Sequence, residues 1–381
     1  MSETSRSMSE QTMVKKEKPA LPDRVAFSNS IRLSGRQWVG LALFAVALMS
    51  AASPLWKQVE DFPFEADYRI PFDLKEDYWL YGRYTDLAVA RCDTLIVGDS
   101  VVWGVYVKRD ETLSHYLNKL TGVEHAANLG LVGAHPLALA GLIEHHAGSI
   151  RNKFVVLQCN PLWMTSPEYD LQERDKPPEV FHARLIPQFW PAIPRYKEEI
   201  SHRIGIVVEQ HSNFRNWTTH LQQAYYDQTD IPAWTLEHPY DHPLKPLIRG
   251  LPPSDNTLRQ IPQPWYKDKT PQDFPWLDME KSLQWKAFQR AVGILQGRGN
   301  RVMVLVGPFN EHMLTPPSRR RYQKVKGTIT SWLAEMKIAH VAPSVLPTEQ
   351  YGDASHPLAE GYEMLARQLL EDVGFRSTLG R

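Results

Sequence analysis

The sequence predicts an α/β fold in which a parallel sheet is covered by helices on both faces. Three observations predict it. Short apolar runs alternate with segments of helical periodicity along much of the chain. The runs span four or five residues, a length that suits buried strands better than helices. Polar and reactive side chains follow the runs, and ligands of open parallel sheets bind beyond the carboxyl ends of the strands.

Three strands are predicted in the first part of this pattern, at residues 94–97, 124–128 and 154–157. A helix separates each of these strands from the next. Residues 111–120 have helical periodicity, and residues 136–146 form a helix with Pro136 in its first turn.

The alternation breaks at Asn160 and resumes near residue 279. Residues 161–280 contain 17 of the 29 prolines and many Trp and Tyr, with only short helical stretches such as residues 194–221. So long a departure is best explained by an inserted cap or side lobe. After it, three helices and two strands are predicted, with Ser318 as the N-cap of the second helix. They span residues 279–295, 302–306, 319–336, 338–341 and 357–371.

An uncharged apolar segment at residues 37–56 predicts one transmembrane helix. About 20 apolar residues suffice to cross a bilayer, and Trp38 and Trp56 would lie at its two interfaces. Basic residues precede the segment and acidic residues follow it, which marks the N-terminal side as cytoplasmic. The basic residues before it are Arg6, Lys15, Lys16, Lys18, Arg24, Arg32 and Arg36. After it come Lys57 and then the acids Glu60, Asp61, Glu65 and Asp67.

We therefore expect a disordered cytoplasmic tail at residues 1–36, an anchor at 37–56 and an exported domain at 57–381. The alternatives are a buried core helix and a signal peptide cleaved near Ser50-Ala51-Ala52. The polar lead of 36 residues is long for a signal peptide, which favours the anchor.

Composition excludes some functions. The chain has 43 Lys and Arg against 43 Asp and Glu, so it lacks the basic footprint of a nucleic-acid-binding protein. Two cysteines, Cys92 and Cys159, do not make a disulfide framework. In parallel strands they would lie at opposite ends of the sheet, too far apart to bridge, so both are predicted to be buried thiols. No metal or other cofactor is expected.

A serine, a histidine and an aspartate follow predicted strands and suggest acyl chemistry. Serine is a weak nucleophile that needs an adjacent base, itself oriented by a third group. Ser100 follows the first strand, and Asp353 and His356 lie three residues apart before the last helix. The developing oxyanion needs N–H donors, which the backbone of Ser100 and Gly133 and the side-chain amide of Asn160 could supply.

Asn310, Glu311 and His312 follow the fourth strand and are candidates to line a substrate pocket. Simpler roles are open for several of these residues. Ser100 could cap a helix, Gly133 could serve a turn, and Asn160 could open an Asn-Pro turn.

The set of residues resembles the SGNH, or GDSL-like, hydrolase superfamily. The four name-giving residues correspond to Ser100, Gly133, Asn160 and His356, and Asp353 lies in the D-x-x-H block. The resemblance implies a flavodoxin-like three-layer sandwich with Ser100, Asp353 and His356 as the catalytic triad.

The resemblance covers residues 93–160 and 300–372, and two departures stand out. The usual Gly-x-Asn-Asp of the third block is Gln158-Cys159-Asn160-Pro161 here, which affects the placement of the Asn160 amide. The fourth residue of the Gly-Asp-Ser-Leu block is Val101. No Gly-x-Ser-x-Gly elbow is present, which counts against an ordinary α/β-hydrolase.

Within the superfamily, one anchor followed by an exported domain resembles the DltD-like and AlgJ- or AlgX-like envelope proteins. This resemblance implies transfer or removal of acyl groups, often acetyl, on a cell-envelope polysaccharide. It also implies an inner-membrane location, a periplasmic catalytic domain and a membrane-bound O-acyltransferase as a partner. Two alternatives stay open: an esterase or lysophospholipase acting at the membrane surface, and a non-catalytic polysaccharide-binding or assembly module.

Overall fold

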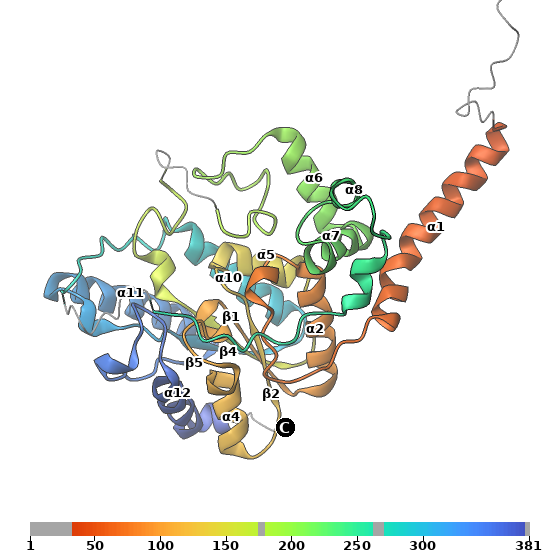
Figure 1. Cartoon of the computed structure of the whole chain (residues 1–381). Coiled ribbons are helices and arrows are strands. Elements are labelled where there is room, and N and C mark those ends of the chain that lie inside the picture. Colours follow the sequence, from red (N-terminus) through yellow and green to blue (C-terminus); the bar gives the residue numbers. More distant parts are fainter. Residues whose placement is uncertain (1–32, 174–179, 262–269, 378–381) are drawn as a thin grey trace, which may run out of the picture. The chain divides into compact units, whose positions relative to one another are not determined.

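A computed structural model describes residues 33–173, 180–261 and 270–377 (Figure 1). Nearly all of the tail predicted to be disordered, residues 1–36, lies outside the described residues. The chain divides into two compact units, residues 1–49 and 50–381. Each unit is described by itself.

The larger unit is built on a five-stranded sheet in which all neighbouring strands are parallel. The strand order is β2-β1-β3-β4-β5, the order found in flavodoxin-like folds. The predicted parallel sheet is confirmed, with strand bounds that differ from the predictions by at most two residues. The strands are β1 (Thr94–Gly98), β2 (Ala126–Gly130), β3 (Phe154–Cys159), β4 (Arg301–Val306) and β5 (Ala339–Val341).

Helices cover both faces of the sheet, so the fold has the three layers expected. Successive strand residues point to opposite faces. Leu95 and Val97 of β1 belong to a core cluster with α2, α5, α10 and α11, whereas Ile96 belongs to a second cluster with α4 and α12 (Figure 1). These helices are α2 (Tyr78–Arg91), α4 (Leu113–Thr121), α5 (Pro136–His145), α10 (Leu283–Gly297), α11 (Pro316–Glu335) and α12 (Ala359–Glu371).

Several predicted helix starts are wrong. Helix α10 begins at Leu283, four residues later than predicted, because the Ser282 side chain caps its start by accepting from the Trp285 N–H at 3.0 Å. Helix α4 begins at Leu113, two residues later than predicted, because Thr112 caps it.

Two further starts differ in the C-terminal half of the chain. The N-cap of α11 is Thr315, not Ser318, because the prolines that follow Thr315 occupy the first turn. The side chain of Ser318 is buried and accepts a hydrogen bond from Trp276 Nε1 at 2.9 Å. Helix α12 begins at Ala359, two residues later than predicted, because Pro357 pairs with Tyr351 in an isolated β-bridge.

Within its described residues, the proline-rich tract has three α-helices, two short 3-10 helices and long irregular stretches. The helix predicted at 194–221 is in fact two, α6 (Ile200–Gln210) and α7 (Asn213–Tyr225), because Ser212 caps the start of α7. Helices α7 and α8 (Ile231–Glu237) contribute to a small separate core built on Leu221, Tyr225, Tyr226 and Trp234. A different part of the tract reaches the carboxyl edge of the sheet, where His182 Nε2 lies 2.7 Å from the Val132 carbonyl oxygen.

Helix α1 (Gly35–Val59) is the one helix in the described part of the chain that is long and apolar enough to cross a membrane. Its most apolar 18-residue window has a mean hydropathy of 1.8, and only 6% of that window is buried, unlike a core helix. By length and composition α1 therefore matches a membrane anchor or a signal sequence.

The C-terminal turns of α1 belong to the larger unit, and the bounds of the anchor at residues 37–56 stay a prediction. Ser53 is buried and accepts a hydrogen bond from Trp79 Nε1 at 2.9 Å. Trp56 packs against Trp217 and Tyr225, each with a ring-centroid distance of 6.1 Å. Trp56 therefore packs against aromatic residues of the larger unit, and its place at a membrane interface stays a prediction.

A buried charge cluster joins Glu60, just after α1, to α2 and α7. His220 Nδ1 lies 2.7 Å from Asp77 Oδ2, and His220 Nε2 lies 2.9 Å from Glu60 Oε1. Tyr225 donates to the same Glu60 oxygen at 2.6 Å, and Arg83 pairs with the other. Burial alone would lower the pKa of His220, but the two carboxylates outweigh it and raise this pKa to about 9.

Candidate active site

Two loops that begin at the topological switch point carry candidate residues. The chain leaves β1 toward β2 on one side and returns to β3 on the other side of β1. In doubly wound sheets, ligands bind at the crevice that this reversal opens beyond the carboxyl ends of the strands. Ser100 follows β1 and Asn160 follows β3, so both lie at this crevice.

The turn that carries Ser100 depends on two glycines. Ser100 opens the short helix α3 (Ser100–Trp103), and the Asp99 side chain caps α3 by accepting from the Val101 N–H at 2.9 Å. A Cβ on Gly98 would lie 2.6 Å from Gln158 Oε1, and one on Gly130 would lie 2.2 Å from the Trp103 nitrogen. Because α3 sits directly against the strand ends, the position of Ser100 is fixed. Asp99, not Ser100, is the capping residue.

The structure brings Ser100, His356 and Asp353 into one hydrogen-bonded chain. The Ser100 hydroxyl lies 2.8 Å from His356 Nε2. His356 Nδ1 lies 2.8 Å from both carboxylate oxygens of Asp353. Asp353 Oδ1 also accepts from the backbone N–H groups of Ser355 and His356, at 2.9 and 3.0 Å. The predicted separation of the serine and histidine, within about 3.2 Å, is thus met, and the arrangement is that of a nucleophile, a base and an orienting acid.

The electrostatics of Asp353 and His356 are those of a base that can accept a proton. Burial alone would raise the pKa of Asp353, but His356 and the backbone donors hold it at about 2. Burial alone would lower the pKa of His356, but the Asp353 carboxylate raises it above the ordinary value of 6.5. Asp353 is therefore ionised at every working pH, and His356 becomes neutral only above its raised pKa.

This gives a predicted pH profile for ester turnover. His356 must be neutral to accept the serine proton, so kcat/KM should rise with pH through a pKa above 6.5 and then level off. Asp353→Asn removes the charge that raises this pKa, so the acid limb should move to lower pH while the plateau falls. Initial rates with p-nitrophenyl acetate across pH 5–9 measure both effects. An acid limb at the same pH in both proteins would contradict the assigned coupling.

The three predicted oxyanion donors lie in the loops after β1, β2 and β3. Ser100 is the first residue of α3, where a backbone N–H has no partner within its own helix. Gly133 has φ +80°, a conformation that favours glycine, and a Cβ there would lie 3.5 Å from His182 Nε2. In the described part of the chain, neither the Ser100 nor the Gly133 N–H makes a hydrogen bond. Both are available to an oxygen of a bound substrate.

Both polar atoms of the Asn160 side-chain amide make hydrogen bonds. Its Nδ2 donates to Asp99 Oδ2 at 2.8 Å, and its Oδ1 accepts from the Leu162 N–H at 3.1 Å. The second contact is that of an Asn-Pro turn, so the simpler role considered for Asn160 is present too. One hydrogen of Nδ2 is left for an oxyanion, and this role stays a prediction.

Asn160→Ala tests that prediction. Loss of one preorganised donor should lower kcat by about 10² to 10³ with little change in KM. Asn256→Ala, at an exposed asparagine outside this site, is the control and should leave kcat unchanged. Steady-state kinetics measure both, and a loss in kcat of less than about threefold in Asn160→Ala would remove this side chain from the oxyanion site.

Three residues near the triad were not among the predicted site residues. Asp99 is buried, and its Oδ2 accepts from Trp163 Nε1 at 2.8 Å as well as from Asn160. The Tyr106 ring packs edge-on against the His356 ring at a centroid distance of 5.3 Å. Asp99 belongs to the Gly-Asp-Ser motif, which was the one available signal. No local pattern points to Trp163 or Tyr106, because their contacts form only in the folded chain.

The residues predicted to line a substrate pocket have other partners. Asn310 is buried, and its Nδ2 lies 3.3 Å from the Asp353 carbonyl oxygen, so it supports the loop that carries the triad acid. Glu311 pairs with Lys326 of α11 at 3.6 Å. His312 Nε2 lies 3.0 Å from the Leu346 carbonyl oxygen. These contacts join only Asn310 to the triad, and a pocket role for Glu311 and His312 stays a prediction.

Both cysteines are buried free thiols, as predicted. Burial raises the pKa of the Cys92 thiol to about 11, and burial also raises that of Cys159. Neither thiol is a nucleophile at neutral pH, because the thiolate is the reactive form.

No protein-family model matches the chain, and no curated protein matches it either. Among solved structures, it is similar to a carbohydrate acetylesterase family member from Sinorhizobium meliloti. The TM-score is 0.32 with 12% sequence identity, over 76% of this chain and 99% of that chain. A likeness at this level carries no conclusion about activity, so the functional argument rests on the geometry of the site.

Proposed function

We propose that this protein is a serine esterase or O-acyltransferase that works through a covalent acyl-enzyme. The observation that carries the proposal is the hydrogen-bonded chain from Ser100 Oγ through His356 to Asp353. This hydrogen-bonded chain lies at the switch point of the sheet. Within the described residues, the backbone N–H groups of Ser100 and Gly133, in the loops after β1 and β2, have no hydrogen-bond partner. In the proposed reaction, the triad supplies the nucleophile and the base, and these two N–H groups are the proposed oxyanion donors.

The proposed reaction has two halves. Ser100 Oγ attacks the ester carbonyl carbon while its proton passes to His356 Nε2, and the N–H groups of Ser100 and Gly133 stabilise the oxyanion. The C–O bond to the alcohol then breaks, and His356 gives its proton to the departing oxygen. In the second half, water or an acceptor hydroxyl loses its proton to His356 and attacks the acyl-enzyme carbonyl. The free acid or a new ester leaves, and Ser100 regains its proton.

We propose O-acetyl groups of a cell-envelope polysaccharide as the substrate, with a membrane-bound O-acyltransferase as a partner. Support comes from the sequence resemblance and from an apolar helix, α1, preceding the domain. Hydrolase and transferase use the same residues and differ only in the acceptor. A small-ester esterase or lysophospholipase, and a non-catalytic module, are the alternatives that the experiments must separate.

Labelling with a fluorescent fluorophosphonate tests the proposal. The wild-type full chain in membranes should be labelled, whereas Ser100→Ala should not. Ser344→Ala, at an exposed serine outside the triad, is the matched control and should label like wild type. Acetate release from acetylated polysaccharide, with or without an added acceptor, then separates hydrolysis from transfer. Labelling that survives Ser100→Ala would overturn the proposed nucleophile.

The proposed topology places residues 57–381 outside the cytoplasm and gives a separate prediction. The basic residues before α1 should remain on the cytoplasmic side. Alkaline phosphatase fused after Arg381, which is active only when exported, should be active, whereas β-galactosidase at the same site should not. The opposite pattern would reverse the orientation.

A further inference from the structure

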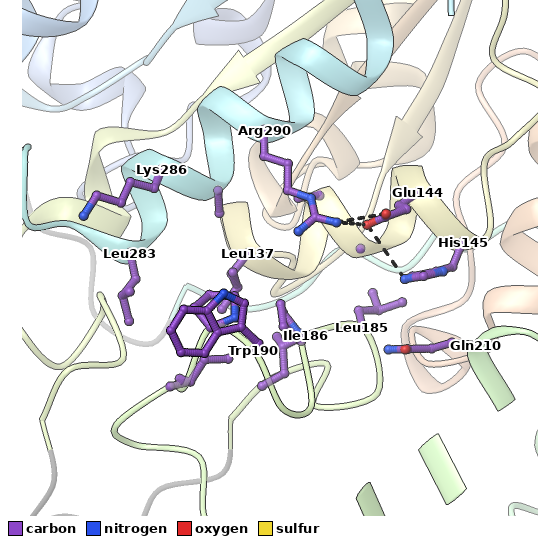
Figure 2. Close-up of a pocket in the computed structure, with 16 residues that line it drawn as sticks. Leu137, Glu144, His145, Leu185, Ile186, Trp190, Gln210, Leu283, Lys286 and Arg290 are labelled. Atoms are coloured by element: carbon purple, nitrogen blue, oxygen red, sulfur yellow. Dashed lines mark hydrogen bonds and ion pairs between the residues drawn. The ribbon is translucent and has the colours of Figure 1, made fainter. Parts of the chain in front are cut away.

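A cavity of about 440 Å³ lies between α5, α10 and residues 185–193, and we call it the α5–α10 cavity (Figure 2). Its volume is in the range of sites that hold small organic ligands. None of the triad residues lines it. The cavity is therefore a separate feature that the ester chemistry leaves unexplained.

One face of α5 and one face of α10 form two of its walls. The lining positions repeat at helical spacing on both helices: 137, 140, 141 and 144 on α5, and 283, 286, 287 and 290 on α10. The third wall lies directly against α5, because a Cβ on Gly141 would come within 1.9 Å of the Leu185 carbonyl oxygen. Close backbone packing thus fixes the shape of the cavity without any ligand.

Most of the lining is aliphatic, including Leu137, Ala140, Leu185 and Ile186. Trp190 adds an indole that is 86% exposed to solvent. Covering this surface with an apolar group would stabilise the complex by about 25 cal/mol per Å² of apolar area buried. The polar side chains of the lining are Glu144, His145, Gln210, Lys286 and Arg290, and Glu144 and Arg290 are paired with each other. The lining therefore suits a hydrocarbon chain.

The charges at the cavity leave one positive group in excess. Arg290 donates to both carboxylate oxygens of Glu144, at 2.6 and 2.9 Å, so these two charges cancel (Figure 2). His145, beside Glu144, has a pKa lowered by burial and is neutral at pH 7. Lys286 is exposed and forms no ion pair with any residue that the structure describes. In Figure 2 its amino end lies on the side of Leu283 and points away from Trp190.

We infer that the α5–α10 cavity binds an anionic amphiphile, a hydrocarbon chain with a carboxylate head. The chain covers the aliphatic walls and the Trp190 ring, and the carboxylate pairs with Lys286. This site goes beyond the proposed function, since it lies outside the triad and requires no ester.

Photocrosslinking in membranes tests the inference on the full chain. A diazirine analogue of dodecanoic acid is the probe, and mass spectrometry locates the labelled peptides. Label should concentrate in peptides containing residues 137–144, 185–193 and 283–290, and excess dodecanoate should compete with it. Label confined to α1, or competition by an oligosaccharide instead of dodecanoate, would overturn the inference.

Variants separate the head group from the chain. Lys286→Glu should reduce cavity labelling at least fivefold and should favour a diazirine analogue of dodecylamine. Lys281→Glu, at an 82% exposed lysine side chain nearby in sequence, is the control. It should change neither the amount of cavity labelling nor the preference between the two probes. Equal labelling of Lys286→Glu and wild type by the acid probe would overturn the assigned head-group site.

Trp190→Ala should also lower labelling severalfold, and because this indole is largely exposed the variant should fold normally. Tyr240→Ala, at a fully exposed aromatic residue, is its control. Fluorophosphonate labelling of Ser100 should be unchanged in all four variants, so a failure of this inference is distinguishable from a failure of the proposed enzyme function. Undiminished labelling of Trp190→Ala would contradict the assigned chain site.

Discussion

Ser100→Ala and His356→Ala should each lose nearly all turnover, by about 10⁴ to 10⁶ in kcat. Ser100 Oγ and His356 Nε2 lie 2.8 Å apart, and neither can act without the other. The double variant should therefore be scarcely slower than either single one. Asp353→Asn should cost less, because it disturbs the orientation and charge of the imidazole without removing the base. Single-turnover and steady-state rates with p-nitrophenyl acetate measure these effects.

All of these variants should stay folded, since none of the exchanged side chains fills the apolar core. Circular dichroism of each variant is the control for this expectation. Additive losses in the double variant would show that the two residues do not act as a unit. A His356→Ala protein that keeps more than a tenth of wild-type kcat would exclude His356 as the base.

The second large effect concerns stability. His220→Leu should lower the free energy of unfolding by about 3–5 kcal/mol, because it leaves the Glu60 and Asp77 carboxylates buried without their shared cation. Both carboxylate side chains are at most 2% exposed, so water cannot replace the lost partner. His202→Leu is the matched control, since this histidine side chain is 59% exposed, and it should change stability little. Urea denaturation of the full chain in detergent measures both.

The same cluster predicts a pH dependence of stability. The folded pKa of His220 is about 9, against an ordinary value of 6.5. Its contribution is therefore complete below pH 6.5 and is lost as the pH rises through 9. The pKa of Glu60 is lowered, so its contribution is lost at the acid end instead. Wild-type stability should fall between pH 6.5 and 9 more steeply than that of His220→Leu, and equal slopes would contradict the assigned charge on His220.

The order of the motifs that carry the candidate site residues could be predicted, because each motif lies directly beside a strand or helix that the local sequence predicts. Gly98-Asp99-Ser100 directly follows a short apolar run, and Asp353 and His356 directly precede a helix. Each block therefore lies at the end of an element that local periodicity indicates. The third block was harder to interpret, because Gln158 and Pro161 replace the expected residues. The structure shows Gln158 accepting from the Asp99 N–H at 3.2 Å, a contact that no spacing along the chain reveals.

Helix ends and the long insertion were predicted less well. Thr315 and Ser318 are both capping residue types, and the prolines that follow Thr315 place the first turn there, so that the Ser318 side chain instead accepts from Trp276 Nε1. The break between α6 and α7 at Ser212 has a similar origin. In a tract dominated by Pro and aromatic residues, packing against the rest of the domain decides where each helix ends.

The sequence by itself determined the α/β class, the parallel sheet, the apolar N-terminal helix and the residues that follow each strand. Periodicity and composition encode these features within about 20 residues, and they need no knowledge of distant contacts. The tertiary structure alone decided which side chains meet. Ser100 and His356 are 256 positions apart, and His220 lies 143 and 160 positions from its two carboxylates. Such pairs depend on the strand order and on how the helices pack over the sheet, because these determine which distant loops share one edge and which charges are buried together.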